Sequence, residues 1–395
     1  MKYVSTRGTA PAVGFETAML SGLAPDGGLY VPAEWPRLAD ARLGELRGRP
    51  YAEIAAAVIA PFVGDDVSRP ELAAMIGAAY GGFGHPAVAP LRQVDAGHWL
   101  LELFHGPTLA FKDVALQLVS RLMERALERT GASATVVCAT SGDTGGAAIA
   151  AFRPSSRAAI VVLHPEGRVS DVQRRQMTTV LADNVHNIAV AGSFDDCQAL
   201  VKAMLADAEF RDRTRLAAVN SINWARILAQ AVYYVAAGIA LGAPDRDLSF
   251  AVPTGNFGNV FAGYVARQLG LPIRRLVVAT NVNDILDRAL SAGRYEVRPV
   301  ASTLSPSMDI QVSSNFERLL FEAGGRDAAA VRRAMAGLKQ SGSFTIDPGT
   351  LAAMRRLFSS GRADEEETLR TMREWHRTTG EFMDPHTAVG YAVAS

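Results

Sequence analysis

The chain has 395 residues, in which 40 lysines and arginines balance 40 aspartates and glutamates. This zero net charge gives no electrostatic reason to bind nucleic acid or an anionic membrane surface, so we expect neither as a partner. The composition, 49% hydrophobic and 20% charged, is typical of a soluble globular protein, and the length predicts two or three domains with ample core.

The first 80 residues are rich in turns, as in APDGGLYVP at 24–32, and then helical, as in YAEIAAAVIAPFVG. The glycines at 81, 82 and 84 predict a domain boundary. Beyond it, short runs of Val, Ile and Ala alternate with helical patterns as far as RRLVVATN at 274–281. This alternation predicts an α/β fold with parallel sheets that are covered on both faces. The acidic run at 364–367 predicts a helix start with a solvated face.

The segment 227–243 is the one stretch that resembles a membrane span. It is rich in Ala and Gly and carries Gln230 and two tyrosines, so it predicts a buried helix instead. The N-terminus, MKYVSTRG, lacks the apolar segment of a signal peptide. The two cysteines, Cys138 and Cys197, exclude a disulfide framework and suit a reducing compartment. We therefore expect a cytoplasmic protein.

Lys112 follows the apolar run LAF and precedes a helical pattern. Apolar surroundings lower the pKa of a lysine and make the neutral, nucleophilic amine more available, so such a lysine can form a Schiff base. Taken alone, an ordinary lysine at the start of a helix is the simpler interpretation.

The loop TSGDTGG at 140–146 lies between the predicted strand TVVCA and the predicted helix AAIAAF. Open α/β sheets bind ligands at the carboxyl ends of their strands. A helix needs one side chain as its N-cap, and this loop offers four. The surplus favours a ligand site, and its candidates are Thr140, Ser141, Asp143 and Thr144.

A second loop, TGNFGN at 254–259, joins the predicted strand LSFAVP to the predicted helix VFAGYVARQLG. A glycine-rich turn at a helix N-terminus points backbone N–H groups and the positive end of the helix dipole at an anion. The loop lacks the Gly-Lys-Ser/Thr of a nucleoside-triphosphate site and the G-x-G opening of a dinucleotide site. The expected ligand is a single phosphate group, and a tight turn without ligand is the alternative that the loop alone leaves open.

Together, two anion-binding loops and one desolvated lysine suit pyridoxal phosphate. The lysine would bind its aldehyde, the glycine-rich loop its phosphate, and the other loop the anionic group of a substrate. The residues thus predict a pyridoxal-phosphate enzyme that acts on a small anionic amino acid. The seven histidines show no metal-binding spacing, so we expect no metal site.

Several longer stretches carry a family resemblance. They are ELFHGPTLAFKD at 102–113, ATSGDTGGAA at 139–148, NSINWARILAQ at 220–230, VPTGNFGN at 252–259, ATNVNDIL at 279–286, STLSPSMDIQVSSNFERL at 302–319 and DPHTAVGYA at 384–392. Their order and their extent over most of the chain closely resemble threonine synthases, which are fold type II pyridoxal-phosphate enzymes.

The resemblance implies three domains. The first is an N-terminal helical cap domain at 1–84. The large cofactor-binding domain, built on a parallel sheet, comprises 85–112 and 225–395. A smaller, mobile α/β domain for the substrate occupies 113–224. Members of the family usually continue beyond a helix like DPHTAV into a Thr-Ala-His-Pro stretch, whose threonine is expected to contact the pyridine nitrogen. This chain ends at Ser395, so we expect either an incomplete chain or an unusual terminus.

The resemblance also implies the roles of individual residues. Lys112 would form the Schiff base with pyridoxal 5′-phosphate and act as acid and base, and Asp143 would lie near the cofactor's 3-hydroxyl. The cradle for the cofactor phosphate would consist of Gly255, Asn256, Phe257, Gly258 and Asn259. The residues facing the substrate would be Thr140, Ser141 and Thr144. The clamp for the substrate's phosphate would be Asn220, Ser221 and Arg226, of which the guanidinium suits a phosphate best.

The implied reaction converts O-phospho-L-homoserine and water to L-threonine and phosphate, by γ-elimination and addition of water at Cβ, as the last step of threonine biosynthesis. The implied assembly is a monomer or a homodimer. Two alternatives stay open. The protein could be a phospho-lyase that releases a 2-oxo acid, or an inactive homologue that binds a phosphorylated metabolite.

Overall fold

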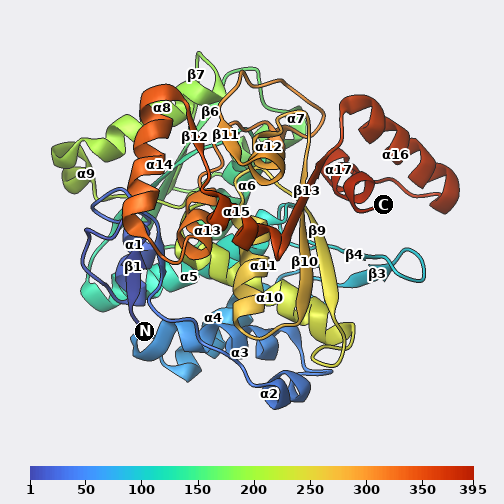
Figure 1. Ribbon diagram of the computed structural model, residues 1–395. Coiled ribbons are helices and arrows are strands. Elements are labelled where there is room, and N and C mark those ends of the chain that lie inside the picture. Colours follow the sequence, from blue (N-terminus) through green and yellow to red (C-terminus); the bar gives the residue numbers. More distant parts are fainter.

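Two parallel sheets form the framework of the chain, and helices pack on them (Figure 1). The computed structural model describes the backbone of residues 1–395 and every side chain except those of Asp195 and Ala218. Along the chain, the strands of both sheets alternate with helices. This arrangement confirms the predicted α/β fold with parallel sheets.

The first 80 residues form a small antiparallel sheet and a group of helices, as the turn-rich and then helical sequence predicted. Val4 and Val31 pair at the centre of this sheet. The elements of residues 1–80 are β1 (Tyr3–Ser5), α1 (Phe15–Ser21), β2 (Tyr30–Pro32), α2 (Asp40–Glu45), α3 (Tyr51–Val63), η1 (Gly64–Asp66) and α4 (Arg69–Tyr80). A hairpin then leads into a long helix; these elements are β3 (Leu91–Gln93), β4 (Trp99–Leu101) and α5 (Lys112–Thr130).

A four-stranded parallel sheet with the strand order β7-β6-β5-β8 follows α5. Its strands are β5 (Ala134–Ala139), β6 (Ala158–Pro165), β7 (Val185–Val190) and β8 (Leu216–Ala218). The helices between them are α6 (Asp143–Phe152), α7 (Asp171–Thr178), α8 (Phe194–Ala206) and α9 (Ala208–Thr214). The loop at 140–146 therefore lies at the carboxyl end of a central strand, as predicted.

A three-stranded parallel sheet with the order β13-β10-β9 forms the second framework. Its strands are β9 (Leu248–Pro253), β10 (Ile273–Thr280) and β13 (Phe358–Arg362). The helical elements of this part are α10 (Trp224–Ala240), α11 (Gly258–Gln268), α12 (Ile285–Ala292), η2 (Pro306–Met308), α13 (Phe316–Ala323), α14 (Ala328–Ser341), α15 (Pro348–Arg355), α16 (Glu365–Thr379) and α17 (Pro385–Ala394). A short hairpin pairs β11 (Arg294–Glu296) with β12 (Ser343–Thr345). Asp364 caps α16, so the acidic run begins a helix as predicted.

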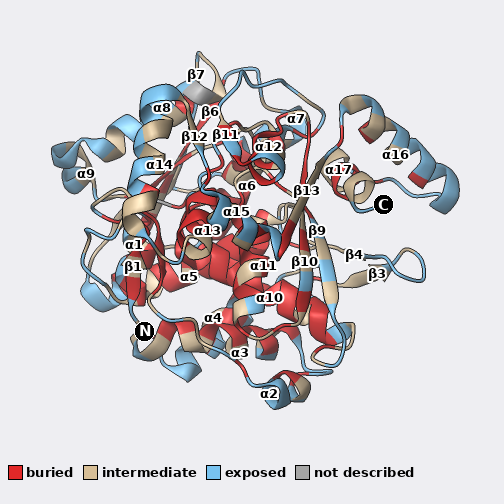
Figure 2. Cartoon of the chain, in the orientation of Figure 1, coloured by how far each residue is buried: buried red, intermediate tan, exposed pale blue. Residues whose placement is uncertain are grey.

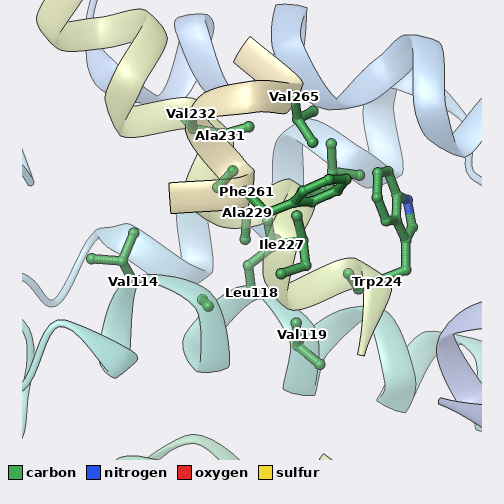
Figure 3. Close-up of a cluster of buried hydrophobic side chains, with 14 of the residues drawn as sticks. Val114, Leu118, Val119, Trp224, Ile227, Ala229, Ala231, Val232, Phe261 and Val265 are labelled. Carbon is green, nitrogen blue, oxygen red and sulfur yellow. The ribbon is translucent and has the colours of Figure 1, made fainter. Parts of the chain in front are cut away.

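The core lies where α5, α10 and α11 pack against one another (Figure 3). Trp224 at the start of α10 and Phe261 on α11 are both fully buried there. Figure 2 shows buried residues concentrated in this region and exposed ones along α9, α14 and α16. Most of the apolar segment 227–243 belongs to α10, which confirms the buried helix. Within the described part of the chain, no helix has the length and apolar character needed to cross a membrane.

The predicted division into domains stays a prediction. The four-stranded sheet falls inside the range 113–224, and the three-stranded sheet falls inside 225–395. Buried residues of both ranges and of the first 80 residues nevertheless belong to one continuous hydrophobic cluster.

Asp26 organises the turn before β2, and its replacement by asparagine is expected to destabilise the fold. Burial by itself would raise the pKa of this carboxyl group, but hydrogen bonds lower it from 3.8 to about 2. The donors are Ser5 Oγ, Thr9 N, Thr9 Oγ1, Ala10 N and Gly28 N. An asparagine turns one of the two acceptor oxygens into a donor, so we expect a loss of about 1–3 kcal/mol in the free energy of unfolding, measured with urea.

The same carboxyl group makes stability depend on pH. Because its pKa is lower in the folded state, its contribution is fully present above about pH 4 and is lost as the pH falls toward 2. The asparagine variant should therefore lose less stability than the unmodified protein over this range. Asp212→Asn, at an exposed position on α9, is the control, and equal pH dependence in all three proteins would contradict the prediction.

Candidate active site

Lys112 is the first residue of α5, as predicted, and is only 8% exposed. Its Nζ lies 2.5 Å from Asp143 Oδ2, 3.3 Å from Ser307 Oγ and 4.6 Å from the centre of the Phe111 ring. The amine is therefore buried and lies beside one aromatic ring, but two of these three neighbours are polar and one is a carboxylate. This ion pair fixes the amine at the start of the helix.

Asp143 is the first residue of α6 and belongs to the predicted loop. Burial alone would raise the pKa of its carboxyl group, but the Lys112 charge, with hydrogen bonds from Lys112 and the Ser307 hydroxyl (3.0 Å), holds it below the ordinary value. Gln173 Nε2 donates to the other carboxylate oxygen. Asp143 is thus an ionised acceptor that contacts the amine directly.

The loop at 254–259 joins β9 to α11, as predicted. Phe257 adopts the left-handed conformation, with φ +62°, and the helix begins at the next residue. Within the described residues, no protein acceptor is found for the backbone N–H groups of 255–259. Since the first N–H groups of a helix have no partner within the helix, these donors suit an anion.

Two glycines let the loop pack closely against neighbouring segments. A Cβ on Gly255 would lie 2.7 Å from the Ser307 carbonyl oxygen, and one on Gly258 would lie 3.3 Å from Asn315 Nδ2. Because Ser307 also contacts Lys112 and Asp143, the glycine-rich loop and the lysine meet at the same segment. A lysine amine beside a cradle of backbone donors fits an aldehyde that carries a phosphate group.

The three hydroxyl groups of the 140–146 loop differ in their hydrogen bonding. The Thr140 hydroxyl accepts hydrogen bonds from Gly142 N and Gly145 N, both at 2.9 Å, so it shapes the loop. Ser141 and Thr144 are half-buried, and within the described residues their hydroxyl groups have no hydrogen-bond partner. These two hydroxyl groups are therefore the ones available to a ligand.

The three residues of the predicted phosphate clamp each make or offer contacts within the protein. Asn220 accepts a hydrogen bond from Ile222 N within its own turn, and the Ser221 carbonyl accepts one from Asn315. Arg226 is buried and donates to the Val219 carbonyl at 3.2 Å, while its Nε has no hydrogen-bond partner in the described part of the chain. Burial lowers the pKa of Arg226 to about 10. The role of these residues in binding phosphate stays a prediction.

The prediction from sequence missed Gln173, Ser307 and His386. Ser307 N donates to His386 Nε2 at 3.2 Å, and His386 Nδ1 lies 3.1 Å from Asp384 Oδ1. A neutral imidazole that accepts a hydrogen bond at Nε2 carries its proton on Nδ1. The Asp384 carboxylate accepts from Nδ1–H and so favours the tautomer that accepts from the Ser307 backbone N–H. Ser307 and His386 belong to stretches that carried the family resemblance, which was the available signal. Gln173 lies outside them.

Comparison with known proteins agrees with this geometry. Residues 2–80 match the family described as threonine synthase N terminus, and residues 85–363 match that of pyridoxal-phosphate dependent enzymes. The threonine synthase of Pseudomonas aeruginosa is 52% identical, and the match covers 100% of this chain and 84% of that protein. A pyridoxal-phosphate-bound threonine synthase structure from Brucella melitensis is 58% identical in sequence and has a TM-score of 0.98. The match covers 100% of this chain and 85% of the Brucella chain.

The yeast threonine synthase structure is also similar, with 41% identity and a TM-score of 0.94, over 100% of this chain and 83% of its own. These likenesses confirm fold type II with a helical N-terminal part, and they confirm pyridoxal 5′-phosphate as the cofactor. The chain belongs to the threonine synthase family of pyridoxal-phosphate-dependent enzymes.

Proposed function

We propose that the protein converts O-phospho-L-homoserine and water to L-threonine and phosphate. The observation that carries this proposal is the position of the buried Lys112 amine. It lies 2.5 Å from Asp143 and beside a glycine-rich loop whose backbone N–H groups have no acceptor among the described residues. The supporting relatives are threonine synthases that match this chain over its whole length.

Each part of the site has a distinct task in this reaction. When bound, pyridoxal phosphate supplies an electron sink for charge that develops on the substrate. The backbone N–H groups of 255–259 bind the phosphate of the cofactor. Lys112 binds the aldehyde and moves the proton at the substrate's Cα, as a lysine amine can when its charge is controlled by neighbours. Asp143 and Ser307 hold the lysine Nζ in place.

We assign the binding of the substrate to residues of the neighbouring loops. Ser141 and Thr144 offer hydroxyl groups that have no hydrogen-bond partner among the residues that the structure describes, and both are assigned to the substrate. Asn220, Ser221 and Arg226 are assigned to the substrate's phosphate, in keeping with the bidentate fit of a guanidinium. The low exposure of Lys112 keeps bulk water from the proton transfers.

The test is the product of the purified chain. With pyridoxal phosphate and O-phospho-L-homoserine, we expect threonine and phosphate in equal amounts, identified by chromatography and a phosphate assay. L-Homoserine, which lacks the phosphate, is the control and should not react. A 2-oxo acid in place of threonine would identify a phospho-lyase, and a cofactor-loaded protein without turnover would identify a binding homologue.

We also propose that the protein acts in the cytoplasm. Both cysteines, Cys138 and Cys197, are free and buried. Burial raises the pKa of the Cys138 thiol to about 11, so this thiol stays protonated and unreactive. Free thiols of this kind suit a reducing compartment.

A further inference from the structure

The glycine-rich loop is held on one side by the segment 313–315. Ser313 Oγ donates to the Gly255 carbonyl at 2.7 Å. Asn315 donates twice to the Asn256 carbonyl, from its backbone N at 3.2 Å and from its side-chain Nδ2 at 2.9 Å. Two consecutive carbonyl groups of the loop are therefore fixed toward the same neighbour.

This contact decides where the next two N–H groups point. In a trans peptide the C=O of one residue and the N–H of the next lie on opposite sides. Because the carbonyl groups of Gly255 and Asn256 face the segment 313–315, the N–H groups of Asn256 and Phe257 face away from it. These N–H groups are among those without a protein acceptor in the described chain. Together with the helix start at Gly258 they form a concave set of donors, the arrangement that binds anions.

Asn315 is itself held rigidly. It is fully buried, and its Nδ2 also donates to the Ser221 carbonyl at 3.1 Å. Its Oδ1 accepts from Arg318 Nη1, which decides the orientation of the amide, with the NH₂ group toward the loop.

Arg318 is fully buried behind Asn315. Its Nη2 donates to the Ile222 carbonyl at 2.7 Å, and its Nε donates to the Tyr30 carbonyl at 3.0 Å. Burial lowers the pKa of Arg318 to about 9, which leaves it protonated at neutral pH. The guanidinium thus connects β2, the turn before α10 and the segment beside the loop, and it places a positive charge behind the donors.

We propose that Ser313 and Asn315, supported by Arg318, are positioning residues that turn the backbone N–H groups of the loop toward the cofactor phosphate. The inference rests on the assignment of residues 255–259 to that phosphate. It has a specific consequence: these side chains determine how strongly the protein prefers pyridoxal phosphate over pyridoxal, which has the same aldehyde and no phosphate.

The test compares the two ligands on the 395-residue, cofactor-free chain by absorbance titration. Ser313→Ala should lower the affinity for pyridoxal phosphate about 5- to 20-fold, since the hydrogen bond that orients the Gly255 carbonyl is lost. Asn315→Leu, which loses two side-chain donors and the partner of Arg318, should lower it about 20- to 100-fold. The affinity for pyridoxal should change less than about twofold in both. Ser313→Thr keeps the hydroxyl group and should restore most of the preference.

A matched control is Asn184→Leu. Asn184 Nδ2 also donates only to backbone carbonyl groups, those of Phe152, Ser155 and Ala158, but it lies before β7 and away from the loop. This variant should keep the preference unchanged. Equal losses for both ligands in Ser313→Ala and Asn315→Leu, or no loss in either, would overturn the proposal. If Asn315→Leu does not fold, as judged by circular dichroism, the result for Ser313→Ala decides.

A further variant separates this inference from the site assignment. Gly255→Val changes the loop itself, because the added Cβ would lie 2.7 Å from the Ser307 carbonyl oxygen. If it keeps the preference for pyridoxal phosphate, the loop does not bind the phosphate, and the site assignment fails. If it abolishes the preference while Ser313→Ala and Asn315→Leu retain it, the site assignment stands and the positioning role is wrong.

Discussion

Lys112→Ala should lower the rate of threonine formation at least about 1,000-fold while the chain remains folded. The variant lacks the one lysine that is buried among the described side chains, and this lysine lies beside both the Asp143 carboxylate and the glycine-rich loop. Steady-state kinetics with O-phospho-L-homoserine measure the loss. Reduction with borohydride followed by mass spectrometry should attach the cofactor to Lys112 in the unmodified protein and to no residue in the variant.

The stability of the Lys112→Ala variant depends on the hydrogen bonds that Asp143 retains. Breaking a fully buried ion pair costs about 3–5 kcal/mol because a charge is left without a partner. Asp143 keeps hydrogen bonds from Ser307 and Gln173, and its side chain is 28% exposed. We therefore expect a smaller loss, about 1–2 kcal/mol, in urea unfolding.

The matched control is Lys339→Ala, at an exposed position in the last turn of α14. Its activity and its borohydride labelling should equal those of the unmodified protein. Retention of more than about 1% of the activity in Lys112→Ala, or labelling at another lysine, would refute the assigned role.

Gly255→Val should lower the affinity for pyridoxal phosphate at least about 100-fold. The added Cβ would lie 2.7 Å from the Ser307 carbonyl oxygen, 3.0 Å from Ile310 Cδ1 and 3.3 Å from Met308 Cα. Two of these three neighbours are backbone atoms, so the overlap is relieved only by moving the segment whose Ser307 contacts Lys112. This movement disturbs the phosphate cradle or the position of the Lys112 amine. Titration of the cofactor-free protein with pyridoxal phosphate, followed by absorbance, measures the loss of affinity.

Gly77→Val serves as the control for this substitution. Gly77 lies in α4, and among the described residues a Cβ there would meet nothing within 4 Å apart from its chain neighbours and the backbone of its own helix. Its cofactor affinity should be unchanged, and its stability should rise slightly or stay the same, because glycine is a poor helix former. Unchanged cofactor affinity in Gly255→Val would show that the loop is not the phosphate site.

Local signals in the sequence were sufficient for the elements that carry the site. The strand–loop–helix pattern at 134–152 and again at 248–268 was predicted from runs of apolar residues and glycine-rich turns, and both occur as β5–α6 and β9–α11. The buried helix α10 was predicted from its Ala-rich apolar run. These features depend on neighbours in sequence, which is why periodicity and turn composition detect them.

The partners of these elements were not accessible in the same way. Ser307 contacts Lys112 from 195 positions away, and Asn315 contacts Asn256 from 59 positions away. No periodicity links such residues, because their contact results from the packing of β9, α11 and the segments after α12. The turn at 305–309 has no regular pattern that would mark it as part of a site.

The two aspartates near Lys112, Asp113 and Asp143, show what the sequence determines and what only the tertiary structure determines. The sequence by itself determined that a lysine begins a helix after an apolar run, and that two glycine-rich loops end parallel strands. It could not determine which carboxylate pairs with the amine. Asp113 is adjacent in sequence, but its carboxylate accepts from Thr108 N and Thr108 Oγ1, both at 2.8 Å. Successive residues of a helix point about 100° apart, so Asp113 faces the preceding turn, and only the packing of α6 against α5 brings Asp143 to Lys112.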